Sequence, residues 1–238
     1  IFHKQLYGIA ITELTSLLSR RSLYCSKYPN GPYSITHFDD AEGNIRYRRI
    51  NHTWVNGKCK YCGVSKKTAL GNENRKTELE THAYEWIHTD NPERLLNMKF
   101  DVIISNPPYQ LDDGGNGASA KPIYHRFIEQ AKKLNPRYLT MIIPARWYAG
   151  GKGLDNFRKS MLDDGQISHL VDYVNAKDCF PGISIGGGVC YFLRTKGYSG
   201  RCHYTNIHDG HTSTAIRRLN EYEAVSYTHL TLPTNSLV

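Results

Sequence analysis

The residues best suited to chemistry are Asn106-Pro107-Pro108-Tyr109. Two consecutive prolines fix φ and stiffen the turn, so the Asn106 amide and the neighbouring carbonyl groups point in set directions. The Asn106 amide oxygen and the Pro107 carbonyl oxygen can each accept an N–H from an exocyclic amine, which draws the amine lone pair toward an electrophile. Tyr109 offers a flat face on which a base can stack, an interaction worth about 1–3 kcal/mol. The pattern predicts that a planar amine attacks an electrophile without help from a strong general base, because the amine proton becomes acidic once the nitrogen has formed the new bond.

The position of this tetrapeptide in the chain supports the same function. It directly follows an apolar run, residues 100–105, that is typical of a central parallel strand. In open α/β sheets, ligands bind beyond the carboxyl ends of the strands. A glycine-rich segment, residues 112–117, comes next and indicates a loop. The simpler alternative is an Asn-Pro turn with a tyrosine packed nearby, since four residues also recur by chance.

A second group of residues could hold a metal ion. Cys59-Lys-Tyr-Cys62 is followed by a glycine, and such a knuckle lets two thiolates reach one Zn²⁺ at about 2.3 Å. His52 lies upstream and His82 downstream, which completes a His-Cys-Cys-His set, with His88 as the substitute for His82. The alternative is a pair of free cysteines in a reduced loop. We expect a closed, structural zinc site that ties down a segment with little core of its own.

Composition narrows the class of protein. The chain has 238 residues, enough for one α/β domain with or without a small appendage. It carries 30 Lys and Arg against 22 Asp and Glu, and the net charge of +8 favours nucleic acid over a membrane as partner, although a solvated basic surface is the alternative. No run reaches the roughly 18 apolar residues of a membrane span. Six cysteines are too few for a disulfide scaffold and indicate a reducing, cytoplasmic setting.

Hydrophobic periodicity predicts alternating strands and helices, which favours an open, mostly parallel α/β sheet. The predicted strands cover residues 5–11, 100–105, 138–143 and 167–174, and the predicted helices cover residues 13–24, 76–87, 121–134 and 153–164. Two short β-like pieces are expected at residues 33–38 and 45–50. Residues 183–193 predict a hairpin that turns at the three consecutive glycines 186–188.

The same pass divides the chain into regions. Residues 1–24 and 76–200 form the predicted catalytic domain, and residues 25–75 break the pattern as an insertion. Residues 201–224 are expected to begin a C-terminal region that is cut short. Residues 225–238 resemble translated sequencing-adaptor read-through, so we leave them out of the functional argument. The first residue is Ile, and we expect the chain to be an internal piece of a longer reading frame.

Residues 100–109 resemble the catalytic motif of adenine-specific amino-methyltransferases, which use S-adenosylmethionine. The resemblance covers roughly residues 5–200 and includes the segments 122–125, 141–147, 150–151, 179–182 and 187–193. Together these segments resemble the methylases of bacterial restriction–modification systems, including those joined to an endonuclease. The resemblance implies a Rossmann-like S-adenosylmethionine methyltransferase sheet with a small zinc-ribbon-like insertion.

The resemblance also implies roles for individual residues. Asn106, Pro107, Pro108 and Tyr109 map onto the catalytic motif, which holds a flipped-out adenine beside the methyl group of the cofactor. Asp90 lies where the family places an acidic residue near the cofactor's adenine ring, although it could equally be a turn aspartate before Asn-Pro.

Two departures from the family pattern concern the cofactor. The glycine-rich cofactor loop should precede the strand at residues 5–11 and is absent from the sequence, so we expect an N-terminally truncated domain that binds cofactor poorly on its own. Ala10 stands where an acidic residue for the ribose is usual. Glu13 is the remaining candidate, though an acidic residue there also favours the helix dipole.

Double-stranded DNA is therefore the expected partner, with N6 of adenine as the methyl acceptor. Eight basic residues after the catalytic motif are candidates for phosphate contacts or for a solvated helix face: Lys121, Arg126, Lys132, Lys133, Arg146, Lys152, Arg158 and Lys159. A glutamine-directed protein methyltransferase shares the tetrapeptide and is one alternative. A non-catalytic zinc-ribbon module that binds nucleic acid is another, but it leaves the α/β alternation unexplained. An endonuclease or helicase domain could share the full polypeptide.

Overall fold

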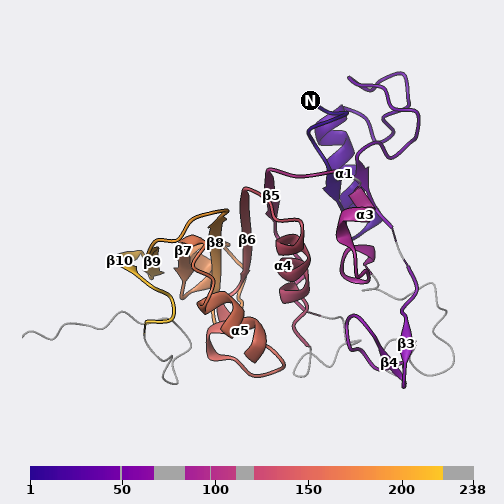
Figure 1. The fold of residues 1–238 in the computed structure, drawn as a ribbon. Coiled ribbons are helices and arrows are strands. Elements are labelled where there is room, and N and C mark those ends of the chain that lie inside the picture. Colours follow the sequence, from indigo (N-terminus) through magenta and orange to yellow (C-terminus); the bar gives the residue numbers. More distant parts are fainter. Residues whose placement is uncertain (49, 67–83, 97, 111–120, 222–238) are drawn as a thin grey trace, which may run out of the picture. The chain divides into compact units, whose positions relative to one another are not determined.

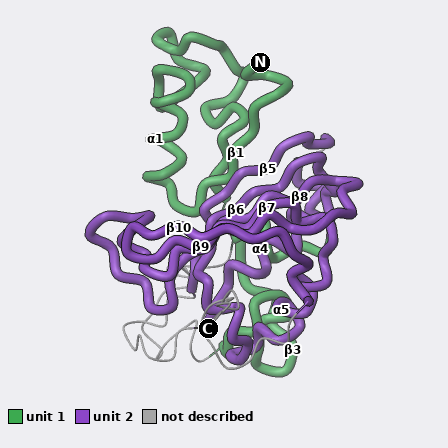
Figure 2. Tube along the Cα trace, turned by 90° about the vertical axis from the view of Figure 1, so that its left-hand side faces the viewer, with its two compact units in different colours: residues 1–90 green, residues 91–238 purple. Residues whose placement is uncertain are grey.

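The computed structural model describes residues 1–48, 50–66, 84–96, 98–110 and 121–221. The chain divides into unit 1, residues 1–90, and unit 2, residues 91–238 (Figure 2). His82, the glycine-rich segment 112–117, the tail 225–238 and most of the predicted helix 76–87 lie outside the described residues. Among the helices that are described, none combines the length and hydrophobicity needed to cross a membrane.

Unit 1 begins with a strand–helix–strand arrangement. Strand β1 (Gly8–Ile9) pairs in parallel with β2 (Ile45–Arg46), and helix α1 (Glu13–Tyr24) has the predicted bounds. A capping box begins the helix, because the Thr12 hydroxyl accepts from the Thr15 backbone N–H while the Thr15 hydroxyl accepts from that of Thr12. The buried guanidinium of Arg20 donates to the Ile45 carbonyl at 2.9 and 2.8 Å, which fastens α1 to β2.

The rest of unit 1 contains a small hairpin and a short helix. Strands β3 (Trp54–Val55) and β4 (Lys58–Cys59) are antiparallel. Asn56 and Gly57 connect them with φ values of 49° and 75°, the left-handed pair that favours Asn-Gly in two-residue hairpin turns. The 3₁₀ helix η2 (Glu85–Ile87) follows closer to the end of the unit. The predicted β-like piece at residues 33–38 is wrong, since no strand forms there.

Unit 2 is built on one mixed sheet (Figure 1). Its elements are α3 (Pro92–Leu96), β5 (Val102–Ser105), α4 (Tyr124–Lys133), β6 (Tyr138–Pro144), η3 (Ala145–Ala149), α5 (Asp155–Leu162), β7 (Ile167–Tyr173), η4 (Ala176–Asp178), β8 (Val189–Thr195), β9 (Cys202–His208) and β10 (His211–Arg217). The strand order is β10-β9-β7-β8-β6-β5. Strands β5, β6, β7 and β9 are parallel to one another, whereas β8 and β10 run the opposite way.

Two features of this sheet differ from the sequence expectation. The predicted hairpin at residues 183–193 is wrong: β8 lies between β6 and β7 and pairs with both, while residues 183–185 form no strand. The three glycines indicated a tight turn, but the partners of β8 are distant in sequence. The sheet also continues past residue 200, because β9 pairs with β7.

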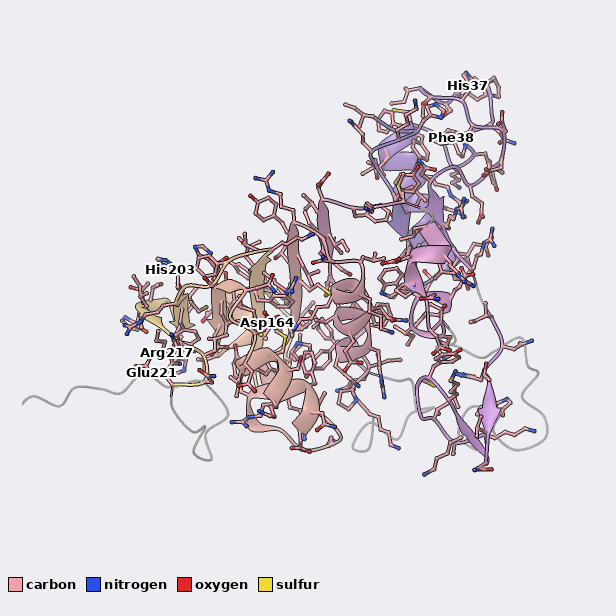
Figure 3. The ribbon with its side chains drawn as sticks, in the orientation of Figure 1. His37, Phe38, Asp164, His203, Arg217 and Glu221 are labelled. Carbon is pink, nitrogen blue, oxygen red and sulfur yellow. The ribbon has the colours of Figure 1, made fainter. Side chains whose placement is uncertain are left out.

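One face of the sheet carries the core of unit 2. Helices α4 and α5 lie on the same side of it (Figures 1 and 2). Burial alternates along β6, where Leu139, Met141 and Ile143 are buried. Where α5 meets β7, Asp164 (Figure 3) accepts from Lys132 at 2.8 Å and from Arg194 at 3.1 Å, joining α4, this turn and β8. The packed sheet therefore fixes the positions at which the connections after its strands begin.

Candidate active site

Three connections of unit 2 meet at one edge of the sheet. The parallel strands β5, β6 and β7 all point their carboxyl ends there, and Val189 at the start of β8 is opposite both Pro144 of β6 and Tyr173 of β7. The tetrapeptide 106–109 follows β5, helix η3 follows β6, and residues 174–188 follow β7. This is the edge at which ligands bind in open α/β sheets.

The residues of the tetrapeptide differ in how far they are buried. Pro107 is buried and Pro108 is half-buried, whereas the Asn106 side chain is exposed. Within the described part of the chain, the Asn106 amide has no hydrogen-bond partner. The amide oxygen is thus free to accept a hydrogen bond from a ligand.

Tyr109 is held by its backbone and buried at its tip. Its carbonyl accepts from the Ile123 N–H at 3.1 Å, and Gln110 forms a β-bridge with Pro122. The Tyr109 hydroxyl is buried and has no partner among the residues described. Burial, together with a smaller contribution from the nearby Cys179 and Cys190 thiols, raises the pKa of Tyr109 to about 12. Tyr109 therefore stays neutral at physiological pH, and its contribution is an uncharged aromatic ring.

Helix η3 and residues 174–188 are fastened to β8 and to one another. The buried indole of Trp147 donates to the Cys190 sulfur at 3.4 Å. The Ala145 N–H donates to the Gly188 carbonyl at 3.1 Å. Gly188 has a φ of 74°, and a Cβ there would overlap the Tyr173 carbonyl oxygen, so this position requires glycine. Sequence reasoning missed Cys179 and Cys190 as neighbours of Tyr109, and the only signal was that both lie in segments resembling the family.

The two predicted cofactor residues belong to unit 1. Glu13 is exposed at the start of α1. The Asp90 carboxylate accepts from the Lys60 ammonium at 2.7 Å and from the Tyr61 hydroxyl at 3.4 Å, and its side chain is 70% exposed. Both carboxylates are accessible acceptors of the kind that suits the hydroxyl and amine donors of S-adenosylmethionine. Their roles stay predictions.

The predicted metal ligands also gather in unit 1. The ligand atoms of His52, Cys59, Cys62 and His88 lie within 4.8 Å of one another. His88, the predicted substitute for His82, takes the fourth place in this group.

Several of the eight basic residues have partners within the protein. Lys132, Lys159 and Arg126 pair with Asp164, Asp163 and Glu129, and Arg158 donates to the Tyr148 carbonyl at 2.7 Å. Lys121, Lys133 and Arg146 are exposed. Lys132 therefore fits neither expectation, because its largely buried ammonium pairs with Asp164 and joins elements of the core.

Comparison with known proteins identifies the family. The sequence model of the Eco57I restriction-modification methylases matches residues 4–180. The chain belongs to this family. It is 35% identical over 225 residues to an uncharacterized adenine-specific methylase of Mycoplasma pneumoniae, a match that covers 84% of this chain and 53% of the relative. The chain thus spans about half the length of this curated relative, and the resemblance seen in the sequence is confirmed.

Solved structures of restriction–modification enzymes are also similar to this Eco57I-family chain. One is a type I methyltransferase subunit from Streptococcus thermophilus, at 14% identity and a TM-score of 0.40, covering 87% of this chain and 43% of that one. Another is the ATP-dependent type ISP enzyme LlaBIII bound to DNA, at 16% identity and a TM-score of 0.44, covering 88% of this chain and 15% of that one. The mixed α/β sheet described above is consistent with the methyltransferase fold of the family.

Proposed function

We propose that this Eco57I-family protein transfers a methyl group from S-adenosylmethionine to N6 of adenine in double-stranded DNA, as part of a restriction–modification system. The observation that carries the proposal is the Asn106-Pro107 corner. It lies at the carboxyl end of β5 with an exposed, uncommitted amide beside a buried proline. The name of the curated relative, an adenine-specific methylase, favours adenine over a protein glutamine as the acceptor.

The residues of the corner act on the amine of the adenine. The Asn106 amide oxygen and the Pro107 carbonyl oxygen accept the two N–H groups, which turns the nitrogen lone pair out of conjugation with the ring. The neutral Tyr109 ring stacks on the base. S-adenosylmethionine, when bound, supplies an electrophilic methyl group on a sulfonium. The nitrogen loses a proton to solvent after the transfer, so no buried base is needed.

An adenine in a duplex reaches this corner only after leaving the base stack. Flipping a nucleotide costs a few kcal/mol. Stacking on an aromatic side chain is worth about 1–3 kcal/mol and offsets part of that cost. The hydrogen bond from the Ile123 N–H to the Tyr109 carbonyl fixes the backbone that carries the ring before the base arrives.

On the cofactor side, the proposal gives Asp90 the adenine ring of S-adenosylmethionine and Glu13 its ribose hydroxyls. The Lys60 ammonium already engages one Asp90 oxygen, which orients the carboxylate. The proposed setting is a reducing cytoplasm, because six cysteines in 238 residues are too few for a disulfide scaffold.

Methyl transfer by the full-length protein tests the proposal. With labelled S-adenosylmethionine and duplex DNA, we expect label in N6-methyladenine. Asn106→Ala should lower this transfer at least about a hundredfold, while DNA binding persists. Asn156→Ala, on the exposed face of α5, is the matched control and should keep full activity. Undiminished transfer by Asn106→Ala, or label in protein and none in DNA, would refute the proposal.

A further inference from the structure

We propose that His52, Cys59, Cys62 and His88 bind one structural Zn²⁺ in unit 1. The argument for this site does not rest on the methyl transfer proposed above. The four residues come from separate places: before β3, at the end of β4, after β4, and after η2. Their ligand atoms nevertheless lie within 4.8 Å of one another, and three of the four residues are buried.

The distances within the cluster match a tetrahedral site. The His52 Nδ1 atom is 3.2 Å from His88 Nε2 and 3.6 Å from the Cys62 sulfur. With Zn–N of about 2.05 Å and Zn–S of about 2.3 Å, the edges of a tetrahedron are about 3.3 Å between two nitrogens and about 3.6 Å between nitrogen and sulfur. One ion can therefore reach these atoms from its ordinary bonding distances.

The backbone between the cysteines holds both sulfurs on one side. The Cys59 N–H donates to the Val64 carbonyl at 2.8 Å, and the Gly63 N–H donates back to the Cys59 carbonyl at 3.0 Å. Gly63 has a φ of 72°, which a residue with a side chain adopts only with strain. This turn places Cys62 beside Cys59.

The orientation of His88 leaves the correct nitrogen for a metal. Its Nδ1 atom lies 2.7 Å from the Tyr84 carbonyl oxygen. A carbonyl only accepts hydrogen bonds, so Nδ1 carries the proton and Nε2 presents its lone pair to the cluster. A backbone carbonyl that fixes the second nitrogen is the usual outer partner of a metal-bound histidine.

The ligand set identifies zinc and a structural role. Two thiolates and two imidazoles complete a four-coordinate shell and leave no position for a reacting water. A two-iron Rieske cluster also uses two cysteines and two histidines, but it binds each pair to a different iron. Ligand atoms that all lie within 4.8 Å fit a single ion instead.

The site would join the β3–β4 hairpin to the segment after η2. The strands of this hairpin have two residues each, too few to be stable alone. Lys60 and Tyr61, which lie between the two cysteines, contact Asp90. The ion thus also fixes the position of these Asp90 partners.

Metal analysis of the full-length protein, purified without chelators, tests the site. We expect about one zinc ion per chain, with two sulfur and two nitrogen neighbours in the zinc X-ray absorption spectrum. Cys62→Ser and His88→Ala should each weaken the zinc affinity at least about tenfold, and the purified variants should therefore contain less zinc. The matched controls Cys25→Ser and His82→Ala should retain it.

The spectrum of the unmodified protein decides the question even if the variants fold poorly. A folded preparation with no stoichiometric zinc, or with iron in its place, would overturn the proposal. So would loss of zinc from His82→Ala with retention in His88→Ala, because the fourth ligand would then be a different residue.

Discussion

The two units of the chain are stabilised in different ways. In unit 2, β6, β7 and β8 each have seven residues, and buried side chains such as Leu139, Leu170 and Phe192 fill one side of the sheet. In unit 1, each strand among the described residues has two residues, and polar groups such as Arg20 and His52 are buried beside the apolar side chains. Sheet pairing and apolar burial therefore position the proposed acceptor site around Asn106, whereas unit 1 depends more on polar side chains and on the proposed metal.

Removing the proposed zinc ion should have the largest effect, and this effect should be confined to unit 1. Zinc contributes about 10–16 kcal/mol to folding in small zinc-binding peptides, so its loss releases the whole hairpin region. We expect a chelator to accelerate amide hydrogen exchange by several orders of magnitude in residues 50–66 and 84–90. Strands β6 and β8 should keep their protection, because they lie in a sheet of a different unit.

Hydrogen-exchange mass spectrometry with and without chelator measures this difference. Restoring zinc should restore protection, which separates metal loss from damage by the chelator. If exchange rose equally in β6 and β8, the two units would not be stabilised separately. If it rose nowhere, the metal would not hold the hairpin.

A single methyl group at Gly188 should damage unit 2 next most severely. A Cβ there would overlap the Tyr173 carbonyl oxygen and lie 2.7 Å from that of Val174, and φ is 74°. We expect Gly188→Ala to lower the free energy of unfolding by about 3 kcal/mol or more, measured by denaturant titration. Gly187→Ala is the matched control: its φ is 86° but nothing lies within 4 Å of the added Cβ.

The control should therefore cost only the backbone strain, about 1–2 kcal/mol. Equal losses from the two variants would show that the close approach of residues 173–174 does not matter. A clearly greater loss at Gly188 supports the close packing at the edge of the sheet that carries the proposed acceptor site.

Local signals in the sequence predicted individual elements better than their partners. Helix α1 was predicted with its observed bounds, because the apolar spacing that indicates it lies within the helix itself. The face that this spacing predicted is nevertheless not the buried one: Leu14 and Leu18 are exposed, and Ser16, Arg20 and Tyr24 are buried. Strands β6 and β7 also agree closely with the prediction. The place of β8 could not be predicted, because the pairing of Ile143 with Cys190 joins residues far apart in sequence. Residues 33–38 form no strand, because the backbone N–H groups of Ser34 and Phe38 donate to the carbonyls of Gly31 and Pro29 in local turns instead of to a neighbouring strand.

The candidate site shows the same division. The strand that directly precedes the tetrapeptide was predicted, because the apolar run of β5 is contiguous with it in the chain. The thiols of Cys179 and Cys190 near Tyr109 come from segments brought in by the fold. The ion pair of Lys132 with Asp164 likewise has no local signal, because a lysine on a helix has the same sequence pattern whether it faces solvent or the core.

The smallest predicted effect concerns Tyr109, where a change in activity can be separated from a change in stability. If the Tyr109 ring acts by stacking, Tyr109→Ala should lower kcat/KM for DNA methylation by about fivefold to a little over a hundredfold, the equivalent of about 1–3 kcal/mol of stacking. Tyr109→Phe should stay within about threefold of the unmodified protein, because it keeps the ring and removes a buried hydroxyl that has no partner among the described residues. Denaturant titration of both variants shows whether a change in stability accounts for the change in rate. If Phe lost as much activity as Ala while remaining stably folded, the hydroxyl would be the active group, and the ring would no longer explain how the base is held.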